Sequence, residues 1–386
     1  MSTQVNSPAP ALETSPPVVM QGSQRLVSLD VFRGITIASM MLVNNAGDWQ
    51  HIYTPLEHAE WHGWTFTDTV FPFFVWIVGV AMTLSFAKRV ERGDNRGRLA
   101  LHTLKRAAII FGVGLVLNGF PYYHLDRIRI SGVLQRIAVC YLIAGLIFLY
   151  TTWRGQLYWI IGLLTTYWLL MMLVPVPGIG AGHLWDPENN LSSWLDRQLL
   201  SGHLYSGTKT WDPEGTVSTL PAIATALFGI MTGHILRLKK APVEKTVWFF
   251  IQGNLLIFVG LMLNMWMPIN KKIWTTPYSI FMAGMASVMF AICYWFVDVR
   301  GWRKWTKPFA IYGMNAIAVY ILAGLLSRGL ELIRIGNSSL HSVIYTNVFA
   351  PLADPYTASM FFGVAFSFTM FLVAWFMYRR NWFLRF

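Results

Sequence analysis

Long apolar runs separated by short polar segments dominate this chain of 386 residues. A helix needs about 20 mainly apolar residues to cross a hydrocarbon layer roughly 30 Å thick, and only helices or closed barrels satisfy their backbone groups there. The runs are too long for barrel strands. The pattern therefore predicts an all-α fold, a polytopic bundle of about ten transmembrane helices. We place the spans at residues 29–46, 65–87, 104–120, 132–151, 156–174, 216–236, 246–267, 277–297, 308–331 and 357–378.

Basic residues set the predicted orientation of the bundle. Lysines and arginines gather in alternate loops, and five separate loops agree. By the positive-inside rule these loops are cytoplasmic, so both termini lie in the cytoplasm, which requires an even number of spans. The basic loops hold Lys88, Arg89, Arg92, Arg96, Arg98, Lys105, Arg106, Arg154, Arg237, Lys239, Lys240, Lys245, Arg300, Arg303, Lys304, Lys307, Arg379, Arg380 and Arg385.

Composition narrows the class of protein. Hydrophobic residues make up 55% of the chain and charged residues 12%, against roughly 25% charged in soluble proteins. The net charge of +12 lies in short loops between apolar runs, so it indicates topology rather than a nucleic-acid partner, and lipid surrounds the chain. Residues 1–24 lack the basic and apolar regions of a signal peptide. We expect them to form a disordered cytoplasmic tail before one transmembrane domain at 25–386.

Two loops on the predicted outer side stand out. Residues 47–64 form a polar and aromatic loop that contains His51, His58 and His62. Residues 175–215 form the longest loop, and long loops in compact domains are usually functional. We expect the second loop to cap something on the outer face.

Charged residues near the first two spans are candidates for chemistry, because an ionisable group at membrane depth is usually paired or functional. Arg25, Asp30 and Arg33 lie just before or inside the first span. The two arginines either anchor its cytoplasmic end, with Asp30 neutralising one, or form an anion site, since arginine forks suit phosphates. Asp68 lies in the second apolar run and also calls for a partner.

Several motifs carry a family resemblance in one consistent order. They are RLVSLDVFRG, VNNAGDW and EHAEWHGWTFTDTVFPFFVWIVG near the start, then ISGVLQRIAVCYL, WDPEGTVSTLPAIATALFGIMTGHIL, INKKIWTTPY and PFAIYGMNAIAVYI. Through these motifs the sequence resembles the heparan-α-glucosaminide N-acetyltransferase family of membrane acyltransferases. The resemblance covers the chain from residue 25 to about residue 330.

The resemblance implies acetyl transfer across a membrane. In that family acetyl-CoA binds from the cytosol, and the amine of a terminal glucosamine on the far side receives the acetyl group. The family's catalytic histidine lies in a His-Ala-x-Trp-x-Gly motif, which matches His58 to Gly63, and its active-site asparagine matches Asn44. Compared with the family, this sequence has a few more residues between Asn44 and His58, and it has His62 at a position where the family usually has an asparagine.

These residue types suit the implied reaction. A protonated amine cannot attack a thioester, so His58 either removes the amine proton or attacks first and forms an acetyl-imidazole. Asn44 is a candidate donor to the oxygen that gains charge. Asp68 either orients His58 or binds the sugar ammonium.

Other residues are expected to hold the two substrates. The expected contacts to the coenzyme are Arg25, Asp30, Arg33, Gln135 and Arg136. For Arg136 the alternative is a structural ion pair with Asp126 or Asp68. For Asp212 and Glu214, in the DPEG segment at 212–215, the alternative is that they only form a turn. The expected contacts to the sugar are Trp61, His62, Asp212, Glu214, Lys271 and Lys272.

A transporter of amino sugars or their oligosaccharides is the main alternative function, because ten spans with polar residues inside also suit a carrier. Transporters often contain two repeats with interrupted helices, and no such symmetry is visible. No metal is expected, since no pair of His or Cys has ligand spacing on one helix. The basic loops favour a bacterial inner membrane, and a homo-oligomer stays open.

Overall fold

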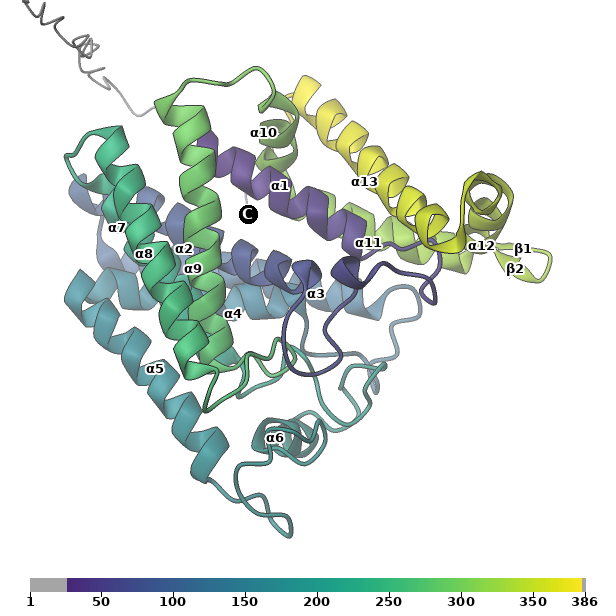
Figure 1. Cartoon of the computed structure of the whole chain (residues 1–386), viewed down its shortest axis with the longest axis horizontal. Coiled ribbons are helices and arrows are strands. Elements are labelled where there is room, and N and C mark those ends of the chain that lie inside the picture. Colours follow the sequence, from purple (N-terminus) through teal and green to yellow (C-terminus); the bar gives the residue numbers. More distant parts are fainter. Residues whose placement is uncertain (1–25, 384–386) are drawn as a thin grey trace, which may run out of the picture.

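Helices form nearly all of the regular structure in the computed structural model, which describes residues 26–383 (Figure 1). A short hairpin of β1 (Arg334–Ile335) and β2 (Ser338–Ser339) is the exception. The predictions for the 1–24 tail and for Arg25 lie outside the described residues. The helices are α1 (Val27–Val43), α2 (Phe66–Glu91), α3 (Arg96–Gly119), α4 (Val133–Tyr150), α5 (Trp153–Leu173), α6 (Leu191–Leu199), α7 (Thr219–Arg237), α8 (Pro242–Leu263), α9 (Thr276–Tyr294), α10 (Lys307–Met314), α11 (Ala316–Leu332), α12 (Leu340–Ile344) and α13 (Pro355–Arg379).

The predicted all-α, multi-span fold is confirmed. In the described part of the chain, eight helices are long and apolar enough to cross a membrane, or nine if the bent pair α10 and α11 forms one span. Each of the ten predicted segments contains a helix or this bent pair. The remaining segment is α1, whose 17 residues fall slightly short of the roughly 20 that a perpendicular crossing needs.

The span predicted at 308–331 is interrupted. α10 and α11 meet at a bend of 78°, where Asn315 leaves helical geometry and its side-chain amide donates to the carbonyl oxygen of Trp382 at 3.0 Å. Through this bond Asn315 holds the C-terminal segment against the bend. The apolar pattern continues through the bend, so hydropathy alone does not reveal it.

Glycines bring the central helices into backbone contact. A β-carbon on Gly79 of α2 would lie 1.9 Å from the carbonyl oxygen of Ala226 in α7, and one on Gly229 would lie 2.0 Å from that of Trp76. α1 meets α10 in the same way at Gly34. Small residues allow this close packing inside membranes, where no hydrophobic effect drives helices together. These contacts fix the helices that carry the candidate site.

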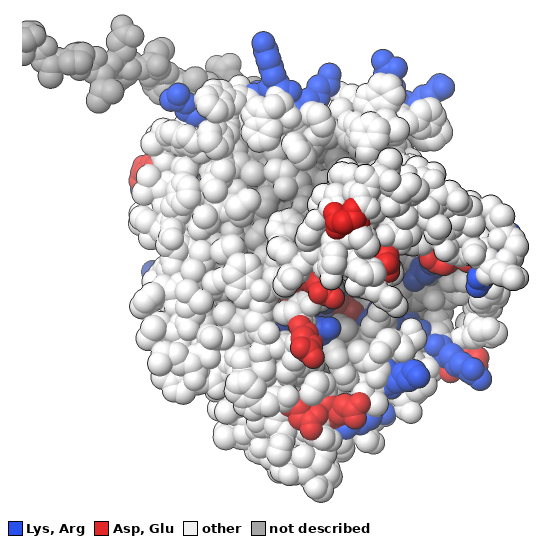
Figure 2. Space-filling view, turned by 45° about the vertical axis from the view of Figure 1, so that its right-hand side comes forward, with Lys and Arg blue, Asp and Glu red and all other residues white. Residues whose placement is uncertain are grey.

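The loops at one end of the bundle gather beside each other, at the lower right of Figure 1. They include the segment between α1 and α2, the segment between α3 and α4, and the long 175–215 loop, which contains α6. Lys and Arg stand without acidic neighbours along the upper edge in Figure 2, whereas acidic and basic residues mix on the lower right. Basic residues therefore predominate at one end of the bundle, where Asp94, Glu91 and Glu244 pair with Arg89, Arg237 and Lys240, and the other end has mixed charge.

Candidate active site

His58 and Asp68 form a hydrogen-bonded pair at the end of mixed charge. Nδ1 of His58 lies 2.6 Å from Oδ1 of Asp68. The Asp68 side chain is 1% exposed and that of His58 is 41% exposed. An ionised carboxylate can only accept a hydrogen bond, so this contact places the proton on Nδ1 and leaves Nε2 as the basic nitrogen. The structure therefore brings the pair together, in the arrangement that orients His58.

Local structure holds Asp68 in place. Thr65 caps α2, and Asp68 occupies the third helical position of a capping box, so Oδ2 of Asp68 accepts from the backbone N–H groups of Thr65 and Ala59, both at 3.0 Å. Tyr278 of α9 donates its hydroxyl to the Asp68 carbonyl oxygen at 2.6 Å. A capping box satisfies orphan N–H groups at a helix start, and here it also fixes the partner of His58.

Burial lowers the pKa of His58 below its ordinary value, although the hydrogen bond with Asp68 acts in the opposite direction. The charges of Lys271 and Lys272 reinforce the lowering, so both lysines lie within electrostatic reach of the imidazole. Burial and the charge of Lys271 also lower the pKa of Lys272. His58 is therefore neutral at pH 7 and can accept a proton.

Aromatic rings of the 175–215 loop pack against the segment that follows His58. Nε1 of Trp61 donates to the carbonyl oxygen of Leu184 at 2.9 Å, and the Trp61 ring meets that of Trp211 edge-on at 5.3 Å. His62 meets Trp185 at 4.4 Å. The 175–215 loop thus covers the segment that follows His58.

Asp212 and Glu214 meet at an arginine that sequence reasoning did not select. Arg129 donates to both oxygens of Asp212 at 2.8 and 2.6 Å and to Glu214 at 2.5 Å. Burial opposes the charge of Arg129, but the carboxylates raise its pKa above the ordinary value. The backbone N–H of Glu214 also bonds Asp212 at 2.9 Å, so DPEG forms the expected turn and holds Arg129. The sequence offered one indication of Arg129: it lies just before the predicted span 132–151, and the acidic residues Asp212 and Glu214 lie just before the predicted span 216–236.

Arg136 is fully buried in α4, and the predicted ion pair with Asp126 or Asp68 is wrong. Its guanidinium donates to the carbonyl oxygen of Gly215 at 3.0 Å and to the hydroxyl of Ser218, and it lies over the ring of Trp274. Asp126 pairs with Arg127, and Asp68 pairs with His58. Nε and Nη1 of Arg136, and Nε2 of Gln135, have no hydrogen-bond partner among the described residues.

Asn44 is the C-cap of α1, with an exposed side chain. Among the described residues it makes no hydrogen bond to His58 or Asp68, whereas neighbouring Asn45 is buried and bonds the Met41 carbonyl oxygen at 2.8 Å.

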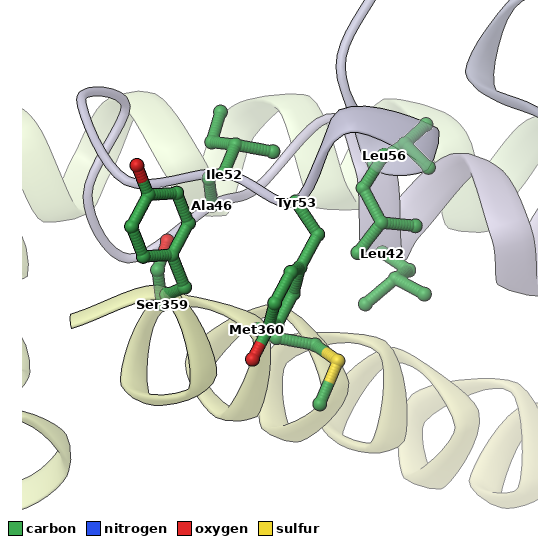
Figure 3. Close-up of a pocket in the computed structure, with 10 residues that line it drawn as sticks. Leu42, Ala46, Ile52, Tyr53, Leu56, Ser359 and Met360 are labelled. Atoms are coloured by element: carbon green, nitrogen blue, oxygen red, sulfur yellow. The ribbon is translucent and has the colours of Figure 1, made fainter. Parts of the chain in front are cut away.

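The segment between Asn44 and His58 packs on α13. Figure 3 shows Tyr53 and Leu56 of this segment beside Ser359 and Met360. The space between them is only about 10 Å³, room for about one water molecule. This pocket therefore fixes the path of the segment and does not hold a substrate.

A second and larger cavity opens inside the bundle. It has a volume of about 480 Å³, and residues of six helices line it, with Asp30 and Arg33 from α1, Arg106 from α3 and Tyr141 from α4. Arg33 donates to Asp30 at 3.4 Å, and Arg106 lies over the Tyr141 ring at 5.0 Å. Nε of Arg106 and the hydroxyl of Tyr141 are buried without a hydrogen-bond partner in the described part of the chain.

This bundle cavity reaches toward His58. Its lining residue on α2 nearest to Asp68 is Phe74, about 9 Å from Asp68 along the helix at 1.5 Å per residue. Gly313, Met314, Ala316 and Ile317, at the bend between α10 and α11, form part of its wall. Arg106 was predicted to be one of the basic loop residues, and Tyr141 was not among the predicted site residues. A charged residue inside the apolar part of α3 was the available signal.

Comparisons with known proteins identify the family of this chain. The family model described as "Heparan-alpha-glucosaminide N-acetyltransferase, catalytic" matches residues 25–262. This chain belongs to the heparan-alpha-glucosaminide N-acetyltransferase family. The match contains His58, Asp68, Arg129 and Arg136, so most of the candidate site lies within the family's catalytic region.

Two curated members of the heparan-alpha-glucosaminide N-acetyltransferase family are similar over most of this chain. The protein of that name from Homo sapiens is 31% identical over 356 residues, covering 77% of this chain and 52% of the relative. The one from Mus musculus is 28% identical over 382 residues, covering 83% and 57%. The chain therefore spans about half the length of the curated relatives it matches. The comparisons do not favour the transporter alternative.

Proposed function

We propose that this protein transfers an acetyl group from acetyl-CoA, bound at the basic end of the bundle, to the amine of a glucosamine-type sugar at the opposite end. One observation carries the proposal. The His58–Asp68 pair lies at the end of mixed charge, and the bundle cavity approaches it from the other side with arginines in its wall. Family membership supplies the reaction class.

The bundle cavity suits an acyl-CoA. Arg33 and Arg106 offer guanidinium forks for phosphate groups. Phe74, Ile77 and Met82 give an apolar wall to a pantetheine arm. The unpartnered Nε of Arg106 and hydroxyl of Tyr141 are donors for its amide oxygens, since a buried donor without a partner is costly unless a ligand satisfies it.

The other residues that were predicted to contact the acetyl donor lie at different positions. Asp30 pairs with Arg33 and so positions it. Gln135 and Arg136 are not part of the cavity lining. Their unpartnered N–H groups lie on α4 between the cavity and the outer loops, where the acetyl end of the donor would have to pass. We assign them to that end rather than to the nucleotide.

His58 supplies the base for the reaction. Its Nε2 takes one proton from the sugar amine as the amine nitrogen bonds to the thioester carbonyl carbon, and the C–S bond breaks to release the coenzyme thiolate, which leaves a neutral amide and a protonated His58. In the two-step route Nε2 itself attacks and displaces the thiolate, and the amine then attacks the acetyl-imidazole. Both routes need the neutral imidazole with a free Nε2 that the Asp68 contact produces.

The remaining candidates serve the acceptor and the developing charge. We assign the exposed amide of Asn44 to the oxygen that becomes negative as the carbonyl turns tetrahedral. Trp61 and His62 offer ring faces and Lys271 and Lys272 offer cations beside His58. Asp212 and Glu214 act through Arg129, which they hold. A bacterial inner membrane, with the basic end cytoplasmic, is the location that we propose.

The experiment uses the purified protein in liposomes, with acetyl-CoA on the basic side and labelled glucosamine on the other. We expect acetylated glucosamine to form, and to be lost in His58→Ala. His51→Ala is the matched control, since His51 lies in the same loop with its own aspartate partner, Asp48, at 2.7 Å. Passage of unmodified sugar, unaffected by His58→Ala, would instead show a transporter.

A further inference from the structure

A groove of about 530 Å³ opens on the side of the bundle, between α1, α10 and α13. Most of its lining is apolar or aromatic, and its main walls are Leu42, Phe309, Tyr312, Val364, Phe368 and Phe371. We call it the flank groove. It shares the helices α1 and α10 with the bundle cavity, but the two have no lining residue in common. The flank groove is therefore a separate feature from the donor site proposed above.

The flank groove faces the lipid. Val364 and Phe368 are 49% and 58% exposed, and both belong to α13, one of the helices that are long and apolar enough to cross a membrane. An empty hollow leaves the atoms of its walls without van der Waals partners. In a bilayer the available partner is a hydrocarbon chain, so the flank groove is expected to hold one.

Two hydroxyl groups in the lining of the flank groove already have partners inside the protein. Ser367 donates its hydroxyl to the carbonyl oxygen of Ala38 at 3.2 Å, and Tyr312 donates to the carbonyl oxygen of Ser367 at 3.0 Å. The ring of Tyr312 also packs against that of Phe371, with centroids 6.1 Å apart. These contacts brace the floor of the groove, and they satisfy the two hydroxyls without a polar ligand. The lining therefore favours an acyl chain over a polar small molecule.

Cations gather where the flank groove meets the basic end of the bundle. α10 begins at Lys307, directly before the lining residue Pro308, and the loop that leads into α10 also contains Arg303 and Lys304. Arg303 pairs with Asp298 at 3.8 Å, whereas Lys304 and Lys307 have no carboxylate within ion-pair distance in the described part of the chain. This loop and the end of α13 both lie at the top of Figure 1, the edge that is basic in Figure 2. Basic residues beside a gap between membrane helices attract anionic lipid headgroups.

The spacing between these cations and the flank groove suits a phospholipid. Trp302 and Trp305 of the same loop are 53% and 47% exposed, and exposed tryptophans prefer the headgroup level of a membrane. The ring of Trp305 meets that of Phe309 in the groove, with centroids 6.2 Å apart. Along α13, Phe371 lies eight positions before Arg379, which is about 12 Å at 1.5 Å per residue. One leaflet is about 15 Å deep, half of the hydrocarbon layer, so a lipid with its headgroup at the loop has its acyl chain beside the groove.

We propose that the flank groove binds an anionic phospholipid, whose phosphate contacts Lys304 and Lys307 and whose acyl chain lies between α10 and α13. The proposal does not depend on the acetyltransferase function, because none of the residues assigned to the reaction lines the groove. It gives the two lysines a ligand of their own, beyond their part in setting the orientation of the bundle.

The test compares two lipids with the same chains and different headgroup charge. The full chain is purified in dodecyl maltoside and titrated with dioleoyl phosphatidylglycerol or dioleoyl phosphatidylcholine, and native mass spectrometry measures the bound lipid. We expect the anionic lipid to bind about 25-fold tighter, since each of two cations contributes about fivefold. Lys304→Gln combined with Lys307→Gln should bring this ratio toward one. Arg92→Gln combined with Lys239→Gln, at two exposed cations of other loops at the basic end, should keep it.

A second pair of variants tests the place of the acyl chain. Val364→Trp fills the flank groove from a half-exposed position, so it should weaken binding of both lipids about tenfold, the contribution of about two buried methylene groups. Ile161→Trp introduces the same side chain at an exposed position of α5 outside the groove, and it should leave both affinities unchanged. Because Val364 already faces outward, its replacement spares the packing of α13 on the bundle.

Several results would overturn the proposal. Equal binding of the two lipids, or an equal loss in the two double variants, would show that only the general charge of the basic end attracts lipid. Binding that Val364→Trp leaves intact would place the lipid outside the flank groove. Displacement of the lipid by an equal concentration of glycerol 3-phosphate, which has the phosphate but no chains, would show a site for a soluble anion. A dimer that Val364→Trp separates would show that a second copy of the chain occupies the groove.

Discussion

Nδ1 of His58 and Oδ1 of Asp68 lie 2.6 Å apart, although one comes from a loop and the other from the first turn of a membrane helix. The contact decides which ring nitrogen carries the proton. It also joins the start of α2 to the loop that precedes it, so the imidazole takes its position from the first turn of the helix.

Asp68→Asn should lower kcat by about 100-fold or more, because general-base catalysis contributes typically 10²–10⁴-fold and an amide can impose the wrong tautomer on His58. The rate of acetyl-glucosamine formation in liposomes measures this. Asp48→Asn alters the equivalent partner of His51 and should leave kcat within about twofold, the size of a surface change. An unchanged kcat in Asp68→Asn would contradict the role of the pair.

The pKa of His58 should lie below 6.5, because burial disfavours the charged imidazole. The neutral base is then present at pH 7 and is lost only as pH falls through the lowered pKa. The rate of modification by diethyl pyrocarbonate, which reacts with neutral imidazole, reports this midpoint when His58→Ala is subtracted. Lys271→Met removes a positive charge that lowers this pKa, so it should move the midpoint to higher pH. A midpoint that moves to lower pH in Lys271→Met would contradict the assignment.

Arg106→Gln should raise the KM for acetyl-CoA about tenfold, the loss expected for one hydrogen bond from a charged donor, with a smaller change in kcat. Tyr141→Phe removes an unpartnered buried hydroxyl, so it should raise KM without destabilising the protein. Initial rates at varied acetyl-CoA measure both effects. Arg98→Gln, an exposed residue of α3, is the matched control. An unchanged KM in both cavity variants would exclude the bundle cavity as the donor site.

Gly79→Ala should destabilise the protein by about 1–3 kcal/mol, the usual cost of overpacking, because the new β-carbon would meet the Ala226 carbonyl oxygen at 1.9 Å. Thermal unfolding in detergent measures the change. Gly162→Ala is the control, since nothing lies within 4 Å of its β-carbon, and alanine favours a helix over glycine by roughly 1 kcal/mol. Equal melting temperatures for the two variants would show that α2 and α7 can separate at little cost.

Much of the fold could be predicted because a membrane constrains sequence strongly. Each predicted span contains a helix or the bent pair, since an apolar run of that length has few alternatives in lipid. The bend at Asn315 could not be predicted, because one polar residue inside an apolar run reads equally as a contact between helices. Its cause is tertiary, in the bond from Asn315 to Trp382.

The candidate site was predictable where one motif holds its residues. His58 and Asp68 lie ten positions apart and meet locally. Arg129 meets Asp212 across 83 positions, and no local pattern shows which cation a distant carboxylate will find. For Arg136, the ion pair was wrong because backbone carbonyl and hydroxyl groups, which hydropathy does not register, accept its hydrogen bonds.

The bend between α10 and α11 has an electrical consequence. The first N–H groups of a helix and the last carbonyls lack partners in their own helix, and such groups are tolerated at membrane depth only beside water or protein. The bend forms a wall of the bundle cavity. Water in the cavity would conduct, so the electrical potential of the solution at the basic end would extend deep into the molecule. Most of the membrane voltage would then drop across the roughly 9 Å of α2 between Phe74 and Asp68. An acetyl group carries no charge across that thin layer, and the leaving thiolate carries none once His58 passes its proton to it, so the proposed transfer would proceed at the same rate in an energised and a de-energised membrane.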